Sequence, residues 1–312
     1  TTEGVQDRVT SMFSHARRSA PETEALAVAV IRDGQDAGQF LALALAERQP
    51  SEVLWALRCL RGIKATRQVA DITLLLGHVE AEVRAEAIWS LMDIEPASLR
   101  EKIFELTGDP DLRVRRRAFD AAMTVAPQDS RLLDLAIDGL AQPDYWLFSR
   151  SMRVLAGADT GLPNLVQHLK ARSLVIVPKL EGSAARMVLG LLAKKLGAEL
   201  DPILVTCVDQ GGHDAKAAAI ETATRLRSEA IIEQGRALLT DQEVQLQLRA
   251  IAYLAVVRDM ESVPQMINLL ATLPDGPPRT AIVVGLRKIS GRSLGFEPEE
   301  WRKWFREQLS DN

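Results

Sequence analysis

The stretch Glu80-Ala81-Glu82-Val83-Arg84-Ala85-Glu86-Ala87-Ile88-Trp89 decides the fold, because a second stretch repeats its plan: Asp109-Pro110-Asp111-Leu112-Arg113-Val114-Arg115-Arg116-Arg117-Ala118-Phe119. Both read Val-Arg-x-x-Ala after an acidic turn, and the Val and Ala share one face of a helix. Weaker copies of this marker are centred on Val53, Leu147, Ala184, Ala215, Leu246 and Pro278. Successive markers are 30 to 37 residues apart. A recurrence of this kind is typical of a repeat array.

Each marker follows another short segment with apolar residues at helical spacing. The segment 66–77, for example, places Val69, Ile72 and Leu76 on one face. Asp, Pro and Gly fill the turns between the two segments and end one helix before the next. Such a helix pair buries its apolar face only by stacking on neighbours. The sequence therefore predicts an all-α solenoid of about eight to nine antiparallel helix pairs.

The composition of the chain is typical of a helical protein, and its net charge is not that of a typical nucleic-acid binder. Apolar residues make up 47% of the sequence and aromatic residues only 4%, which is low for a sheet protein. The net charge of -4 differs from the strongly basic balance of many nucleic-acid binders.

Cys59 and Cys207 lie in apolar helical contexts, so we expect buried free thiols and a cytoplasmic protein. We expect no membrane span. The chain begins with Thr1, which leaves room for a longer natural N-terminus.

The marker and its period resemble those of the short HEAT-like repeats of bacterial proteins, over roughly 35–291. This resemblance implies three parts: N-terminal capping helices over 1–34, the repeat array over 35–291, and a C-terminal capping helix over 292–312. The longest gap between markers lies between Leu147 and Ala184. There Pro178 and Gly182 favour an extended loop, and we expect a bend of the array near 172–182.

The sequence offers no recognisable catalytic or metal-binding pattern. His15, His78, His168 and His213 are scattered, and none is followed by Glu, so no metal site is predicted. Nucleophile, phosphate-loop and dinucleotide motifs are absent from the sequence. We predict no catalytic residue and no cofactor.

The two x positions of each marker are expected to face outward, on the concave side that second helices line in HEAT-like arrays. They are Ala85, Glu86, Arg116, Arg117, Ser149, Arg150, Arg186, Met187, Ala217, Ala218, Leu248 and Arg249. Arg153 follows Arg150 by about one turn, and Tyr145 and Trp146 open the same segment. Arginine suits carboxylate or phosphate capture, and aromatic residues beside it are frequent interface anchors. The alternative is that these arginines pair with acidic residues of neighbouring turns, as we expect for Arg84 and Arg115.

We therefore predict a protein-binding scaffold that holds an acidic partner segment through Arg116, Arg117, Tyr145, Trp146, Arg150, Arg153 and Arg186. One alternative is a nucleic-acid-binding or DNA-base-processing HEAT-like enzyme that uses the same groove. Another is a structural subunit of a larger assembly. For that role Trp301, Trp304 and Phe305, which share one helix face, offer a second surface; a lid on the last repeat is the other reading of these three residues.

Overall fold

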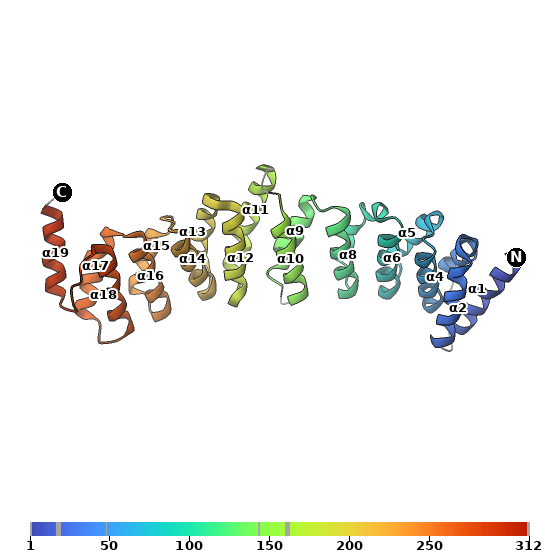
Figure 1. Cartoon of the computed structure of the whole chain (residues 1–312), viewed down its shortest axis with the longest axis horizontal. Coiled ribbons are helices and arrows are strands. Elements are labelled where there is room, and N and C mark those ends of the chain that lie inside the picture. Colours follow the sequence, from blue (N-terminus) through green and yellow to red (C-terminus); the bar gives the residue numbers. More distant parts are fainter. Residues whose placement is uncertain (1, 17–19, 48, 143, 160–162, 311–312) are drawn as a thin grey trace. The chain divides into compact units, whose positions relative to one another are not determined.

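The computed structural model describes residues 2–16, 20–47, 49–142, 144–159 and 163–310, and all regular structure among them is helical. The prediction of an all-α repeat fold is confirmed. The chain forms two compact units, Thr1–Leu132 and Leu133–Asn312, with the division inside one helix, α9. In each unit, short first helices alternate with longer second helices (Figure 1).

The first unit begins with one helix pair and continues with three repeats. The pair is α1 (Thr2–Ala16) and α2 (Ala20–Arg32). The first helices are α3 (Gly38–Glu47), α5 (Val69–Leu74) and α7 (Ile103–Leu106), extended by the 3-10 turns Gly34–Ala37, Thr66–Gln68, Leu75–Gly77 and Pro96–Leu99. The second helices are α4 (Pro50–Gly62), α6 (Ala81–Ile94) and α8 (Leu112–Val125).

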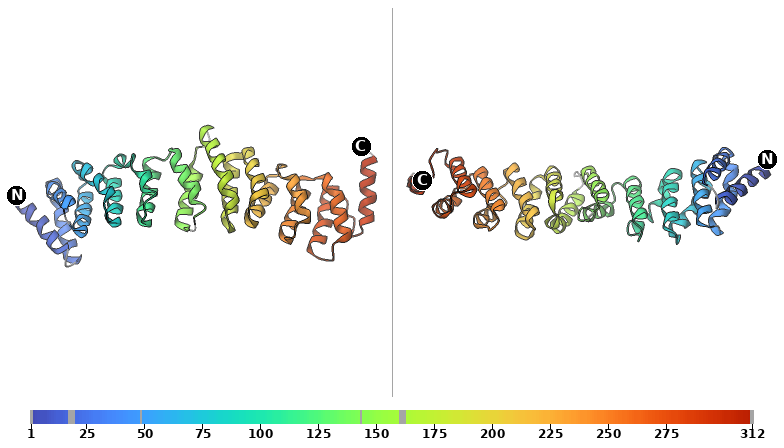
Figure 2. Two further views of the ribbon diagram at one scale, coloured as in Figure 1. Left: turned by 180° about the vertical axis from the view of Figure 1, so that it is seen from behind. Right: turned by 90° about the horizontal axis from the view of Figure 1, so that it is seen from below.

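The second unit continues the same alternation. Its first helices are α9 (Ser130–Gly139), α11 (Pro163–Ile176), α13 (Asp201–Gln210), α15 (Ile232–Ala237) and α17 (Val263–Thr272). Its second helices are α10 (Tyr145–Gly157), α12 (Gly182–Leu196), α14 (His213–Leu226), α16 (Val244–Val257) and α18 (Pro277–Ser290). The last helix is α19 (Pro298–Ser310), and the 3-10 turns are Val177–Lys179, Gly197–Leu200, Leu238–Thr240 and Met260–Ser262. The successive second helices α12, α14 and α16 lie side by side in both figures (Figures 1 and 2).

The repeat marker has a constant place in the structure. In α6, α8, α10, α12, α14 and α16 the marked residue is the third residue of the second helix. Val83, Val114, Ala215 and Leu246 are buried there, whereas Leu147 and Ala184 are half-buried. The marker shifts by one residue at the ends of the array, where Val53 is the fourth residue of α4 and Pro278 is the second of α18. The position of the marker in the two strong copies, Val83 and Val114, is therefore the same in six repeats.

The extended loop expected around Pro178 is wrong. Residues 172–176 complete α11, the turn Val177–Lys179 follows, and α12 begins at Gly182. The extra residues of this repeat lengthen its first helix, since α11 has 14 residues whereas α9, α13 and α17 have 10 each. Pro178 fits because it sits at the start of a 3-10 turn, where a missing N–H costs little. The bend near 172–182 stays a prediction.

Candidate functional site

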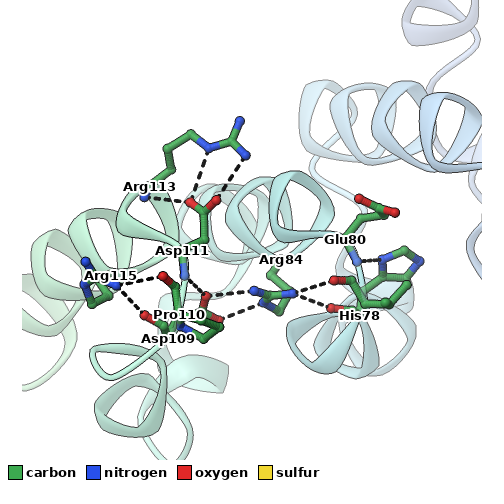
Figure 3. A network of polar contacts seen from close by, with 9 residues as sticks. His78, Glu80, Arg84, Asp109, Pro110, Asp111, Arg113 and Arg115 are labelled. Atoms are coloured by element: carbon green, nitrogen blue, oxygen red, sulfur yellow. Dashed lines mark hydrogen bonds and ion pairs between the residues drawn. The ribbon is translucent and has the colours of Figure 1, made fainter.

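Arg84 of the marker is a structural residue that ties one repeat to the next (Figure 3). Its Nε and Nη2 each donate to a carboxylate oxygen of Asp109 at 2.7 Å, and its Nη1 donates to the carbonyls of His78 and Val79. The hydrogen bonds from Arg84 hold the pKa of Asp109 below its usual range. The pair lies at the turns between first and second helices, so Arg84 is unavailable to a partner.

Arg115 repeats half of this arrangement one repeat later. Its Nη1 donates to the carbonyls of Asp109 and Pro110 at 2.7 and 2.9 Å, as Figure 3 also shows. The expectation that Arg84 pairs with an acidic residue of a neighbouring turn is confirmed. Arg115 is structural in another way, because it donates to backbone carbonyls of the turn before its own helix. Other basic residues of the second helices remain for binding.

The expectation that all variable positions face outward is wrong at two repeats. Ala85 and Glu86 of α6 are 5% and 6% exposed, and Ala217 and Ala218 of α14 are 6% and 3% exposed. These helices pack against second helices on both sides, and this packing covers positions that a lone helix pair would leave open. Glu86 avoids an isolated buried charge because Arg61 of α4 donates to it at 2.8 Å.

In the first unit a tryptophan lies between two arginines. The guanidinium carbons of Arg61 and Arg117 lie 4.1 and 4.3 Å from the Trp89 ring centroid, which is within cation–π range. Burial lowers the pKa of Arg117; the carboxylate of Glu86 opposes this, and the like charge of Arg61 adds to it. Among the residues that the structure describes, no carboxylate forms an ion pair with Arg117. Arg116 is half-buried and is engaged within the chain.

A hollow of about 400 Å³ adjoins Trp89 and Arg117. Its other lining residues are Ile88, Met92, Asp93, Asp120, Ala121 and Thr124. Asp93 lies 3.6 Å from Arg61, and Asp120 also interacts within the chain. This hollow therefore combines one cation with two carboxylates, which makes it a mixed surface and not the strongly basic one that the sequence predicts.

In the second unit α10 places the predicted aromatic residues and arginines at its start and on its exposed side. Tyr145 is 83% exposed, while Trp146 is half-buried. Asp144 caps the helix by accepting hydrogen bonds from the backbone N–H groups of Trp146 and Leu147. The Arg150 guanidinium lies 5.0 Å from the Trp146 ring, and Arg153 is exposed.

Arg186 of α12 is exposed and forms a weak ion pair within the chain. Its Nε lies 3.1 Å from Glu221 of α14, and the two side chains are 60% and 51% exposed. An ion pair this exposed contributes about 1 kcal/mol or less, so a partner's carboxylate can replace it.

The second helices of the second unit are strongly basic as a group, which the sequence analysis missed. The helices α10, α12, α14, α16 and α18 contain eleven Lys and Arg residues but only two acidic residues, Asp214 and Glu221. The whole chain has 38 basic and 42 acidic residues, so its charges are segregated by element. In α10 and α12 the five cations Arg150, Arg153, Arg186, Lys194 and Lys195 share two neighbouring helices without any acidic residue. Counting charge by element, not by chain, could have revealed this segregation.

The C-terminal aromatic residues do not form the exposed surface that the sequence analysis considered. Trp301 is fully buried and Trp304 is 6% exposed, because α19 packs against α17 of the same chain. Trp301 Nε1 donates to the Gly295 carbonyl at 2.8 Å, and the two indoles meet edge to face. Phe305 is half-buried and lines a hollow of about 430 Å³ with Pro264 and Arg302.

The remaining reactive groups have structural surroundings. Cys59 and Cys207 are buried, which confirms the expected free thiols, and burial raises the pKa of each to about 12. No group of three or more potential metal ligands occurs within the described residues. In that same part of the chain, no helix is both long and apolar enough for a membrane crossing.

No protein-family model matches this chain, and a search of curated proteins gave no sequence match. Among solved structures, importin beta is similar over 91% of this chain and 48% of its own, with 13% identity and a TM-score of 0.54. Another importin beta structure matches over 86% and 42%, with 13% identity and a TM-score of 0.51. A structure of the TOG domain arrays of microtubule polymerases covers 91% of this chain and 82% of its own, at 10% identity and a TM-score of 0.45.

The two importin beta likenesses establish a fold. The chain is a helical-repeat solenoid, and it spans about half the length of importin beta. At such low identity the shared fold says nothing about a partner, and only the side chains of this chain bear on its function.

Proposed function

We propose that this chain is a non-catalytic scaffold that binds an acidic segment of a protein partner on the second helices of its second unit. The observation that supports this most is the absence of any acidic residue from α10 and α12, two neighbouring helices with five cations. Arginines suit such a role because a guanidinium binds a carboxylate through two parallel hydrogen bonds.

Aromatic residues beside these cations favour a protein partner. Tyr145 is exposed at the start of α10, and Trp146 supports the Arg150 guanidinium from one side. Arg150 is half-buried and also interacts within the chain, and a guanidinium already ordered in this way loses less side-chain freedom when it binds a carboxylate. Tyr145, Trp146, Arg150, Arg153 and Arg186 are thus the residues proposed to hold the partner.

Arg116 and Arg117 have a smaller place in this proposal. Both belong to the first unit, and the hollow beside Arg117 also contains Asp93 and Asp120. Arg117 is the better candidate of the two, because its guanidinium rests on Trp89 without an ion-pair partner among the described residues.

The test uses a labelled synthetic peptide of repeated Glu-Glu-Leu, a matching Lys-Lys-Leu peptide, and fluorescence anisotropy. We expect the acidic peptide to bind the wild type and the basic peptide not to bind. The variant Arg150→Glu/Arg153→Glu/Arg186→Glu should lose at least tenfold in affinity, since three attractions become repulsions. The matched control is Arg67→Glu/Lys102→Glu/Lys179→Glu, which makes the same charge change at exposed residues outside the second helices.

Equal loss in both variants would mean that only net charge matters, and this contradicts a localised site. The same protein is titrated with duplex and single-stranded DNA at low salt. Tight binding with a steep salt dependence, together with no binding of the acidic peptide, would favour the nucleic-acid alternative.

A further inference from the structure

Gly190 lies in the middle of α12 and faces open space. No atom beyond its own helix turn lies within 4 Å of the position that a methyl group would take there, among the described residues. Other glycines inside helices have a packing reason. A methyl group at Gly235 would lie 3.0 Å from the Tyr253 ring, and one at Gly285 would lie 3.1 Å from Ile251 Cγ2.

A glycine inside a helix weakens that helix relative to alanine, because it leaves more backbone freedom to be lost on folding. Nothing within the described chain requires the missing side chain of Gly190. A group from outside the chain that packs closely against the helix would require a glycine at this position, because a glycine lets another backbone come closest.

The side chains around Gly190 indicate the chemistry of a partner segment that would pack there. Arg186 and Lys194 lie one turn before and one turn after Gly190, about 6 Å away along the helix axis in each direction. Both are on the solvent side, and Met187, which follows Arg186 directly, is 45% exposed. The surface therefore has a cation at each end, an exposed apolar side chain next to Arg186 and a gap at Gly190 in its centre.

We infer that the bound partner segment is an acidic amphipathic helix that crosses α12 at Gly190. Its carboxylates would pair with Arg186 and Lys194, and an apolar residue would rest on Met187. This inference rests on the proposed function and adds the position and the conformation of the partner. A helix fits because two of its carboxylates eight residues apart are separated by about 12 Å along its axis, as Arg186 and Lys194 are along α12.

The test compares Gly190→Trp with Gly190→Ala, using the Glu-Glu-Leu peptide and fluorescence anisotropy. Because the space at Gly190 is open, both variants should fold and melt at or above the wild-type temperature. Gly190→Ala should bind the peptide within about threefold of the wild type, whereas the indole of Gly190→Trp should block the crossing and weaken binding at least tenfold. The control for added bulk is Ala171→Trp, at an exposed residue of the first helix α11, which should bind as the wild type does.

The outcomes separate this inference from the function that it extends. If Gly190→Trp folds and binds like the wild type while the arginine reversal variant does not bind, the scaffold proposal stands and the crossing at Gly190 is wrong. If neither wild type nor variants bind the acidic peptide, both proposals are overturned. A version of the peptide with a central proline, which breaks a helix, should bind at least fivefold more weakly; equal binding would contradict the helical conformation.

Discussion

Arg84 and Asp109 form a two-pronged ion pair between consecutive repeats, with both nitrogen–oxygen distances at 2.7 Å. The side chains are 12% and 6% exposed, so the pair is largely shielded from water. It fixes the turn that precedes α8 to the second helix of the previous repeat, α6. Because neighbours are the only contacts available to a repeat, a tie of this kind supports the stacking of the first unit.

Replacement of Arg84 by alanine should destabilise the first unit by about 3 kcal/mol, since removing one partner leaves a buried carboxylate without its charge partner. The measurement is urea unfolding followed by hydrogen exchange of α6 and α8. The control is Arg113→Ala, which removes an ion pair with Asp111 whose side chains are 63% and 28% exposed. That variant should lose less than about 1 kcal/mol. Equal losses in the two variants would contradict the structural role of Arg84.

The same pair predicts how stability depends on pH. The Arg84 guanidinium holds the pKa of Asp109 below its usual range, so the folded form binds a proton less readily than the unfolded form. The folding stability that comes from this pKa difference is complete above the unfolded pKa of about 4. It is lost as the pH falls through the lower folded pKa. Urea titrations from pH 7 to pH 3 should show a shallower acid loss for Asp109→Asn than for the wild type. An unchanged acid limb in this variant would exclude Asp109 as its source.

Much of the architecture was predictable because the marked residue of each repeat stands at the same position of its second helix. Val83 and Val114 occupy the third residue of their helices, and the weaker markers Ala215 and Leu246 follow the same rule. The segment near Pro178 was not predictable from turn residues, because proline is also tolerated at the start of a 3-10 turn. Hydrophobic periodicity alone did not distinguish a longer α11 from a loop.

Removal of the Trp301 side chain should detach the C-terminal helix. Trp301 is fully buried between α19 and α17 and donates a hydrogen bond to Gly295. Trp301→Ala should cost about 3–5 kcal/mol through the cavity that it leaves. Limited proteolysis should then cleave near Pro298 much faster than in the wild type. Phe305→Ala, at a half-buried residue of the same helix, is the milder comparison. Equal cleavage rates in wild type and Trp301→Ala would contradict the docking of α19.

The two cysteines should be inert in the folded protein. Burial raises the pKa of Cys59 and Cys207 to about 12, so at pH 8 almost no reactive thiolate is present. A thiol reagent such as dithionitrobenzoate should react with neither thiol in buffer and with both in urea. The Cys59→Ala and Cys207→Ala variants assign each reaction. Fast labelling of the native protein would show that the corresponding helix is less well packed than the structure indicates.

The binding residues were harder to predict than the fold, because neighbouring repeats decide which variable positions remain exposed. Ala217 and Ala218 are covered in α14, whereas Arg186 and Met187 are exposed at the equivalent positions of α12. Counting residues along the sequence treats the two sites alike. Packing between second helices distinguishes them, and only the structure shows that packing.

Affinity capture from a native lysate, read by mass spectrometry, tests the proposed scaffold most directly. The wild type is compared with Arg150→Glu/Arg153→Glu/Arg186→Glu and with the control Arg67→Glu/Lys102→Glu/Lys179→Glu. We predict that the wild type and the control retain a common protein partner with an acidic segment, and that the folded arginine variant loses it. If all three proteins retain the same partners, the basic surface of α10 and α12 is not the binding site.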